Sequence, residues 1–195
     1  MTVETYTIVI TGLGGQGLIR LIEILGTALL IEGYNVITSE THGLSQRGGK
    51  VTCFLRFGDR LNAPIPMIGS ADMIIALEEC SILEALKYAK LNKTTNLIIS
   101  TYEKQTINVE YPSLKYILDR LIEISDNIHI IPAMEIAIEH TGNLKAMNTV
   151  ILGYVINFLP INKKSIEESL AEYFTGSILE VNIKAFNKGF KLKQF

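Results

Sequence analysis

The hydrophobic pattern opens with a strand, a helix and a second strand. Residues 6–11 (YTIVIT) form a continuous run of a tyrosine and β-branched residues, which is typical of a buried strand. Residues 18–31 carry apolar side chains at helical spacing. Gly33 stands where a glycine commonly ends a helix, and residues 34–39 predict the next strand. The chain therefore begins with a strand–helix–strand unit.

Strands and helices alternate through the middle of the chain, and helices follow at its end. The further predicted strands cover residues 51–57, 72–77, 96–101 and 128–131. The further predicted helices cover residues 79–90, 113–125, 133–140, 144–158, 163–173 and 177–190. Ser113 is the expected N-cap of its helix. This order predicts an α/β fold with three α/β/α layers, a mainly parallel Rossmann-like sheet and a helical C-terminal part.

Composition narrows the class of protein. The chain has 195 residues, 48% of them hydrophobic, and a formal net charge of −2. Its basic residues are scattered, so no nucleic-acid-binding stripe is visible, and no apolar run approaches the roughly 20 residues that span a bilayer. The first residues lack the basic region of a signal peptide. We therefore expect one cytoplasmic domain over residues 1–195 that binds neither nucleic acid nor membrane.

The two cysteines, Cys53 and Cys80, are 27 residues apart and have no neighbouring thiol. An iron–sulfur cluster typically takes four thiolates, so this chain has too few cysteines to hold one. Both are expected to be buried free thiols of a cytosolic protein.

The first candidate binding motif is the sequence GLGGQG at residues 12–17. Gly12, Gly14 and Gly17 fit the pattern G-x-G-x-x-G between a strand and a helix. The glycines permit a tight turn, and the first turn of the helix offers unpaired N–H groups and a positive dipole end to a phosphate or carboxylate. Gly15 adds another bare backbone position and Gln16 a neutral amide. In the alternative interpretation, these glycines only pack the helix against the sheet.

Glu40 lies 23 residues after Gly17, at the end of the second predicted strand. In a dinucleotide-binding fold an acid at this place would hold the ribose 2′-OH. The spacing therefore favours an NAD(P)- or FAD-dependent oxidoreductase. Against a self-contained enzyme of this kind, His129 and His140 stand alone and no clear catalytic pair follows.

The segment after Glu40 does not resemble the helix that a dinucleotide fold would place there. Before the next strand it holds mainly polar residues and glycines, among them His42, Gly43, Ser45, Gln46, Arg47, Gly48 and Gly49. Arg47 supplies a forked cation suited to carboxylate or phosphate, and His42 can exchange a proton near neutral pH. Because loops after parallel strands gather at one edge of a sheet, we expect this loop beside the glycine loop. The alternative is a solvated loop whose charges face water.

The two loops together resemble the gamma-subunit family of 2-oxoacid:ferredoxin oxidoreductases, and within it the beta subunits of indolepyruvate ferredoxin oxidoreductases. The resemblance extends beyond GLGGQG and SETHGLSQRGG to motifs at residues 56–59 (RFGD), 64–66 (PIP), 69–72 (GSAD) and 182–189 (NxxAFxxG), and to Asn148 at the start of a buried helix. Residues before the QRGG core point to the arylpyruvate branch. Arg20 and Glu23 depart from the family pattern, as does the glycine-free turn at residues 92–96.

The resemblance implies an enzyme that oxidatively decarboxylates a 2-oxoacid, forms an acyl-coenzyme A and reduces ferredoxin. Thiamine diphosphate, Mg²⁺ and iron–sulfur clusters are then expected on a partner alpha subunit, with no cofactor or metal bound by this chain alone and coenzyme A as co-substrate. The chain would be a single gamma-type catalytic domain that completes the active site.

For the two loops we expect an anion-binding role in that active site. The glycine loop would take a coenzyme A phosphate or the substrate carboxylate, Arg47 would neutralise its charge, and Gln46 and His42 would orient it. A third possibility is a purely structural subunit whose loops only form an interface. No catalytic residue can be named from the sequence.

Overall fold

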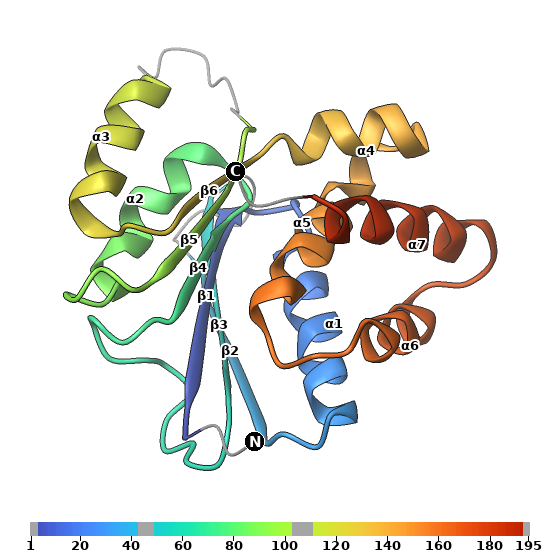
Figure 1. Ribbon diagram of the computed structural model, residues 1–195, viewed down its shortest axis with the longest axis horizontal. Helices are drawn as coiled ribbons and strands as arrows, with labels where there is room; N and C mark the ends of the chain where they lie inside the picture. Colours follow the sequence, from blue (N-terminus) through green and yellow to red (C-terminus); the bar gives the residue numbers. More distant parts are fainter. Residues whose placement is uncertain (1–3, 43–48, 103–110, 193–195) are drawn as a thin grey trace.

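The computed structural model describes residues 4–42, 49–102 and 111–192, and its centre is a six-stranded sheet between two helical layers (Figure 1). The strands are β1 (Tyr6–Leu13), β2 (Val36–His42), β3 (Lys50–Phe57), β4 (Met73–Ala76), β5 (Asn96–Ser100) and β6 (Ile128–Ile131). Their order in the sheet is β2-β3-β1-β4-β5-β6. The predicted α/β/α architecture is confirmed.

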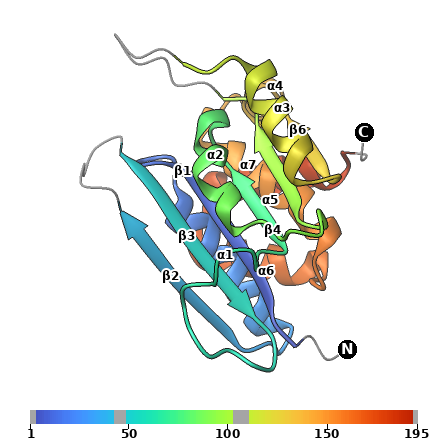
Figure 2. The same ribbon diagram turned by 90° about the vertical axis from the view of Figure 1, so that its left-hand side faces the viewer.

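The sheet is mixed because one strand runs against the others. β3 pairs antiparallel with both β1 and β2, whereas β1, β4, β5 and β6 are parallel neighbours. Seven residues separate β2 from β3, fewer than a parallel crossover needs, and a strand that returns over so short a connection runs antiparallel. The opening strand–helix–strand unit is consequently split, with β3 inserted between its two parallel strands (Figure 2).

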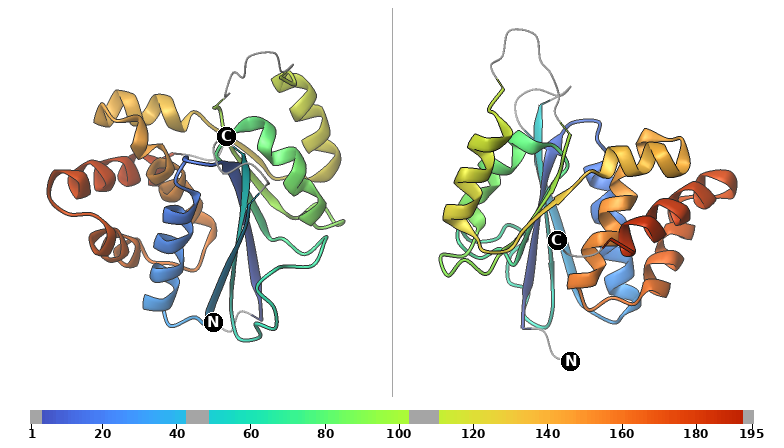
Figure 3. Two further views of the ribbon diagram at one scale, coloured as in Figure 1. Left: turned by 180° about the vertical axis from the view of Figure 1, so that it is seen from behind. Right: turned by 45° about the horizontal axis from the view of Figure 1, so that its top comes forward.

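The α-helices of the described residues cover both faces of the sheet, the larger group on one face and the smaller on the other (Figures 1 and 3). The first group is α1 (Leu18–Ile31), α4 (Ala133–Thr141), α5 (Met147–Val155), α6 (Lys163–Tyr173) and α7 (Gly176–Phe190). The second group is α2 (Ile82–Ala85) and α3 (Leu114–Ile124). Each layer buries its own apolar cluster against the sheet, and the cluster under the five helices is the larger.

The helix predicted over residues 79–90 is broken into η1 (Glu79–Ser81), α2 and η2 (Leu86–Tyr88). At its start, the Glu78 carboxylate accepts the Ser81 N–H at 2.8 Å and tightens the first turn. At its end, Ala89 adopts an extended conformation and bridges to the chain before β4. The helix predicted over residues 144–158 likewise has 3₁₀ turns, η3 (Leu144–Ala146) and η4 (Ile156–Phe158), at the two ends of α5.

The predicted caps at Gly33 and Ser113 are confirmed. Gly33 has φ 88°, its N–H bonds to the Leu30 carbonyl, and the Tyr34 N–H bonds to Leu29, which is the Schellman arrangement that ends α1. The Ser113 hydroxyl accepts the Tyr116 N–H at 3.2 Å and caps α3.

The two thiols have different environments. Cys53 is fully buried on β3, as predicted, whereas Cys80 is only partly buried and the prediction for it was wrong. Cys80 follows the carboxyl end of β4 in the short turn η1. Within the described ranges, no helix combines the length and apolar character needed to cross a membrane.

Candidate functional site

The glycine loop joins β1 to α1 at the carboxyl edge of the parallel strands. Gly17 is the residue before α1 and has φ 79°, a left-handed conformation that favours glycine. The first helical bond runs from the Leu21 N–H to the Gly17 carbonyl, so the N–H groups of residues 18–20 have no acceptor within the helix. Among the described residues, no side chain caps this end, and the first turn of α1 holds no acid. The positive end of α1 is therefore open to an anion.

Gln16 braces the loop with its side chain. Its Oε1 accepts the Leu13 N–H at 2.6 Å, and its Nε2 donates to the Leu77 carbonyl at 3.2 Å. A Cβ atom on Gly12 would lie 2.6 Å from this Oε1. Gly12 is thus needed for the close approach of Gln16, and the Gln16 amide fixes the loop from within.

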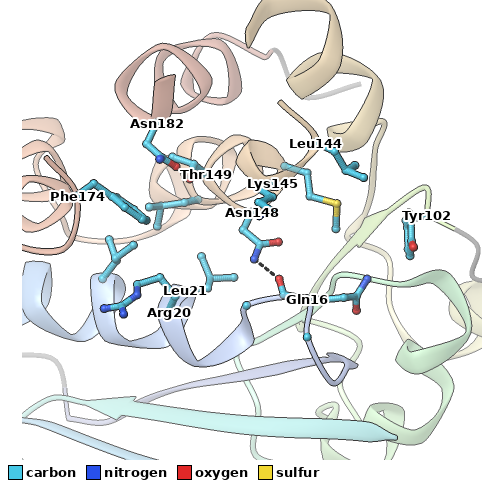
Figure 4. Close-up of a pocket in the computed structure, with 15 residues that line it drawn as sticks. Gln16, Arg20, Leu21, Tyr102, Leu144, Lys145, Asn148, Thr149, Phe174 and Asn182 are labelled. Atoms are coloured by element: carbon cyan, nitrogen blue, oxygen red, sulfur yellow. Dashed lines mark hydrogen bonds between the residues drawn. The ribbon is translucent and has the colours of Figure 1, made fainter. Parts of the chain in front are cut away.

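Asn148 connects the loop to a helix far along the chain. From the start of α5 its Nδ2 donates to the Gln16 carbonyl (Figure 4). A Cβ atom on Gly17 would lie 2.9 Å from the same Nδ2. Because a carbonyl can only accept, this bond fixes the orientation of the amide. The other amide atom, Oδ1, is buried and has no hydrogen-bond partner within the described ranges.

A cavity of about 400 Å³ lies between the glycine loop, α1, α5 and α7 (Figure 4). Its apolar wall includes Leu21, Ile24, Met147, Leu152 and Phe174. Its polar lining includes Gln16, Arg20, Lys145, Asn148, Thr149 and Asn182. The cavity therefore combines an apolar body with polar groups at the glycine loop, a combination common in small-molecule sites.

The polar groups of the cavity differ in how far the fold already satisfies them. Thr149 Oγ1 donates to Asn182 Oδ1 at 2.6 Å. Arg20 pairs with Glu23 at 3.0 Å and stacks over the ring of a tyrosine on α6. Lys145 is exposed and forms no ion pair within the described part of the chain. A ligand would thus find the helix N–H groups and the Lys145 ammonium.

Sequence reasoning missed most of this lining. Arg20 was noticed only as a departure from the family pattern. Lys145 and Thr149 carry no local signal, because they reach the cavity only through the packing of η3 and α5 near α1. Asn182 was named only as the first residue of the motif at residues 182–189. Asn148 was predicted.

Most of the second predicted loop lies outside the described residues. This applies to Ser45, Gln46, Arg47 and Gly48, and to the side chain of His42. Its flank is described: the Gly49 carbonyl accepts the Gly14 N–H at 2.8 Å. β2 also runs parallel to β1, so the loop leaves the sheet at the edge that carries the glycine loop, as expected.

Glu40 does not lie where a dinucleotide fold needs its acid. It aligns with Cys53 on β3, and through Cys53 with Ile10 on β1. It is therefore two strands from β1, about 10 Å at the usual strand spacing. In the dinucleotide fold the acid ends the strand next to β1. The inserted β3 removes Glu40 from the glycine loop.

A buried acid that sequence reasoning missed lies at the end of β4. Glu78 is 2% exposed and accepts a hydrogen bond from the hydroxyl of Tyr111, which in turn accepts the Cys80 N–H at 3.0 Å. Burial, and then the bond to Glu78, raises the pKa of Tyr111. Burial, with Glu78 nearby, also raises the pKa of Cys80, so its thiol is protonated and is a poor nucleophile at neutral pH.

The sequence model of the family described as "Pyruvate ferredoxin/flavodoxin oxidoreductase" matches residues 7–192. The chain is 37% identical over 191 residues to the indolepyruvate oxidoreductase subunit IorB of Archaeoglobus fulgidus, covering 94% of this chain and 92% of that one.

Two solved structures share the fold. The pyruvate oxidoreductase subunit PORC of Thermotoga maritima aligns with a TM-score of 0.73 and 18% identity over 97% of both chains. The 2-oxoglutarate:ferredoxin oxidoreductase of Magnetococcus marinus aligns with a TM-score of 0.75 and 20% identity over 96% of this chain and 31% of that one. In the latter protein the fold is one part of a longer chain.

Proposed function

The chain belongs to the pyruvate ferredoxin/flavodoxin oxidoreductase family, and from this premise we propose that it is the small subunit of an enzyme that oxidises an arylpyruvate, such as indolepyruvate, to an acyl-coenzyme A. The 37% identity to an indolepyruvate oxidoreductase subunit supports this substrate class. Electrons would pass to ferredoxin through the complex.

The redox and carbanion chemistry of such an enzyme belongs to cofactors, and this chain is poorly equipped to hold them. No three His, Cys, Asp or Glu side chains in residues 4–42, 49–102 and 111–192 come together as a metal site. The whole chain has two cysteines, fewer than an iron–sulfur cluster takes. We therefore assign thiamine diphosphate, Mg²⁺ and the clusters to a large alpha subunit, with this chain completing the active site.

The observation that carries the proposed role is the cavity at the glycine loop. The N–H groups of residues 18–20 and the Lys145 ammonium would bind an anionic group, either a phosphate of coenzyme A or the carboxylate of the oxoacid. Asn148 holds the loop in place through its bond to the Gln16 carbonyl. Arg47, Gln46 and His42 of the neighbouring loop would neutralise and orient the same group.

This role is tested by Asn148→Asp in the complex co-produced with its large subunit. The substitution replaces the donor to Gln16 with an acceptor and adds a negative charge beside the anion site. We expect the KM for coenzyme A or for the arylpyruvate to rise about tenfold or more, measured as substrate-dependent reduction of ferredoxin. Arg47→Ala should act on the same KM.

The matched control is Asn127→Asp, which makes the same chemical change at an exposed position before β6, and it should leave both KM values unaltered. Unchanged KM values in both site variants would contradict the anion-binding role. If Arg47→Ala weakens assembly while the assembled complex keeps its kinetics, the loops serve the interface alone.

A further inference from the structure

The thinner helical layer carries a groove on its outer surface, opposite the layer that forms the cavity. Two adjoining hollows of about 380 Å³ and 330 Å³ run between the η1–α2–η2 segment and α3. They share part of their lining and so form one channel. We call it the lysine-rimmed groove and define its apolar lining by Ile68, Leu83, Leu86, Leu91, Tyr116 and Ile124.

One end of the lysine-rimmed groove exposes an unusual amount of apolar surface. Leu91 is 99% exposed and Ile68 is 74% exposed, and the neighbouring Met67 is 80% exposed. Large exposed apolar side chains that cluster around a groove mark interaction surfaces in soluble proteins. The turn that presents Leu91 is well defined, since Asn92 Oδ1 accepts the Thr94 hydroxyl at 2.7 Å. A hydrogen-bonded turn thus presents Leu91 to solvent, beside the exposed side chains of Ile68 and Met67; these three residues form the apolar patch.

The rim of the lysine-rimmed groove is positively charged. Arg120 pairs with Glu123 at 3.1 Å, and Lys90 pairs with a carboxylate outside the lining. The ammonium groups of Lys87 and Lys93 have no carboxylate partner in the described ranges. An apolar lining with a basic rim complements a segment that carries apolar and acidic side chains.

Resting on the proposed heteromeric function, we infer that the lysine-rimmed groove docks an acidic segment with apolar side chains that belongs to the large subunit. A second copy of this chain is a poorer occupant. An isologous contact would place the same lysines opposite each other, and like charges across an interface oppose association.

The test uses the complex of both subunits, diluted and weighed by mass photometry at low and high salt. Leu91→Glu places a charge in the apolar patch. The double variant Lys87→Glu with Lys93→Glu reverses the charge of the two unpaired rim residues. Each should raise the apparent Kd of assembly about tenfold or more. The double variant should also reduce the salt dependence, because fewer charge pairs remain to be screened.

Matched controls are Ile178→Glu and Lys184→Glu on the exposed side of α7, and both should assemble like the wild type. Since these side chains are exposed, the variants should keep the wild-type melting curve. Assembly of the groove variants at wild-type affinity would overturn the inference, as would a dimer of the small subunit that Leu91→Glu abolishes. If either of these contrary results is obtained with a complex that oxidises arylpyruvate, the docking inference fails while the proposed function stands. A wild-type chain that binds no thiamine-bearing subunit contradicts both proposals.

Discussion

His129 lies on the edge strand β6 in an environment that resists a positive charge. Its Nδ1 is 2.9 Å from the Tyr154 hydroxyl, and its ring centroid is 4.9 Å from that of Phe158. Its Nε2 is buried without a hydrogen-bond partner in the described part of the chain. Burial lowers the pKa of His129 below its ordinary value of 6.5, so the folded protein holds this ring neutral.

At the residue scale we therefore expect stability to fall as the pH drops below about 6.5. Below that pH the unfolded chain binds a proton at this histidine that the folded chain does not. The free energy of unfolding therefore falls by up to about 1.4 kcal/mol for each unit by which the pH drops. Urea unfolding between pH 5.5 and pH 8 measures the effect. His129→Gln should reduce the slope of the free energy of unfolding against pH, and the control His140→Gln should leave that slope unchanged. An equal slope in His129→Gln would contradict this origin of the pH dependence.

Two helices of the C-terminal part cross at very short range. A Cβ atom on Gly189 of α7 would lie 1.9 Å from the Val150 carbonyl oxygen on α5, and one on Gly153 would lie 2.2 Å from the Phe186 carbonyl oxygen. Both distances are far below van der Waals contact with backbone atoms. The crossing brings α5 and α7 together, and both helices line the cavity.

At the element scale, Gly189→Ala should force α5 and α7 apart and lower the free energy of unfolding by about 3 kcal/mol. The same change at Gly26 in α1 is a matched control, since its nearest neighbour would be Val36 Cγ1 at 3.7 Å. Gly26→Ala should be neutral or stabilise by up to about 1 kcal/mol, because alanine favours a helix. Chemical denaturation measures both. Equal changes in the free energy of unfolding for the two variants would show that helix propensity, and not the close crossing of α5 and α7, determines the effect of Gly189→Ala.

For the whole molecule, the strand order determines which loops can meet. Because β1 and β2 run parallel with β3 between them, the glycine loop and the flank of the second loop share one edge, joined by the Gly14–Gly49 hydrogen bond. The same insertion separates Glu40 from that edge. The arrangement favours a site shared by two loops over a dinucleotide site.

We accordingly expect the purified chain to show no binding of NADH or FAD in a fluorescence or calorimetric titration. The physical reason is the distance of Glu40 from the glycine loop, which leaves a ribose without its carboxylate. The complex with its large subunit serves as the reference for a correctly folded chain. Saturable 1:1 binding of a dinucleotide that Glu40→Ala removes would instead support the hypothesis of a self-contained oxidoreductase.

The sequence by itself determined the local elements and the two signature motifs. It predicted α1, α6 and β6 at their observed bounds and the caps at Gly33 and Ser113, because periodicity and cap chemistry are read over a few neighbouring residues. It also indicated the family, which the matches to known proteins show. These features depend on short segments.

Only the tertiary structure decided how those segments meet. The pairing of β3 with both β1 and β2, the bond from Asn148 to Gln16 across 132 residues, and the lining by Lys145 all join distant parts of the chain. Hydrophobic periodicity tells which face of an element is buried, but the identity of its neighbour depends on chain reversal and packing. The sequence could therefore name the glycine loop, whereas packing built the cavity around it.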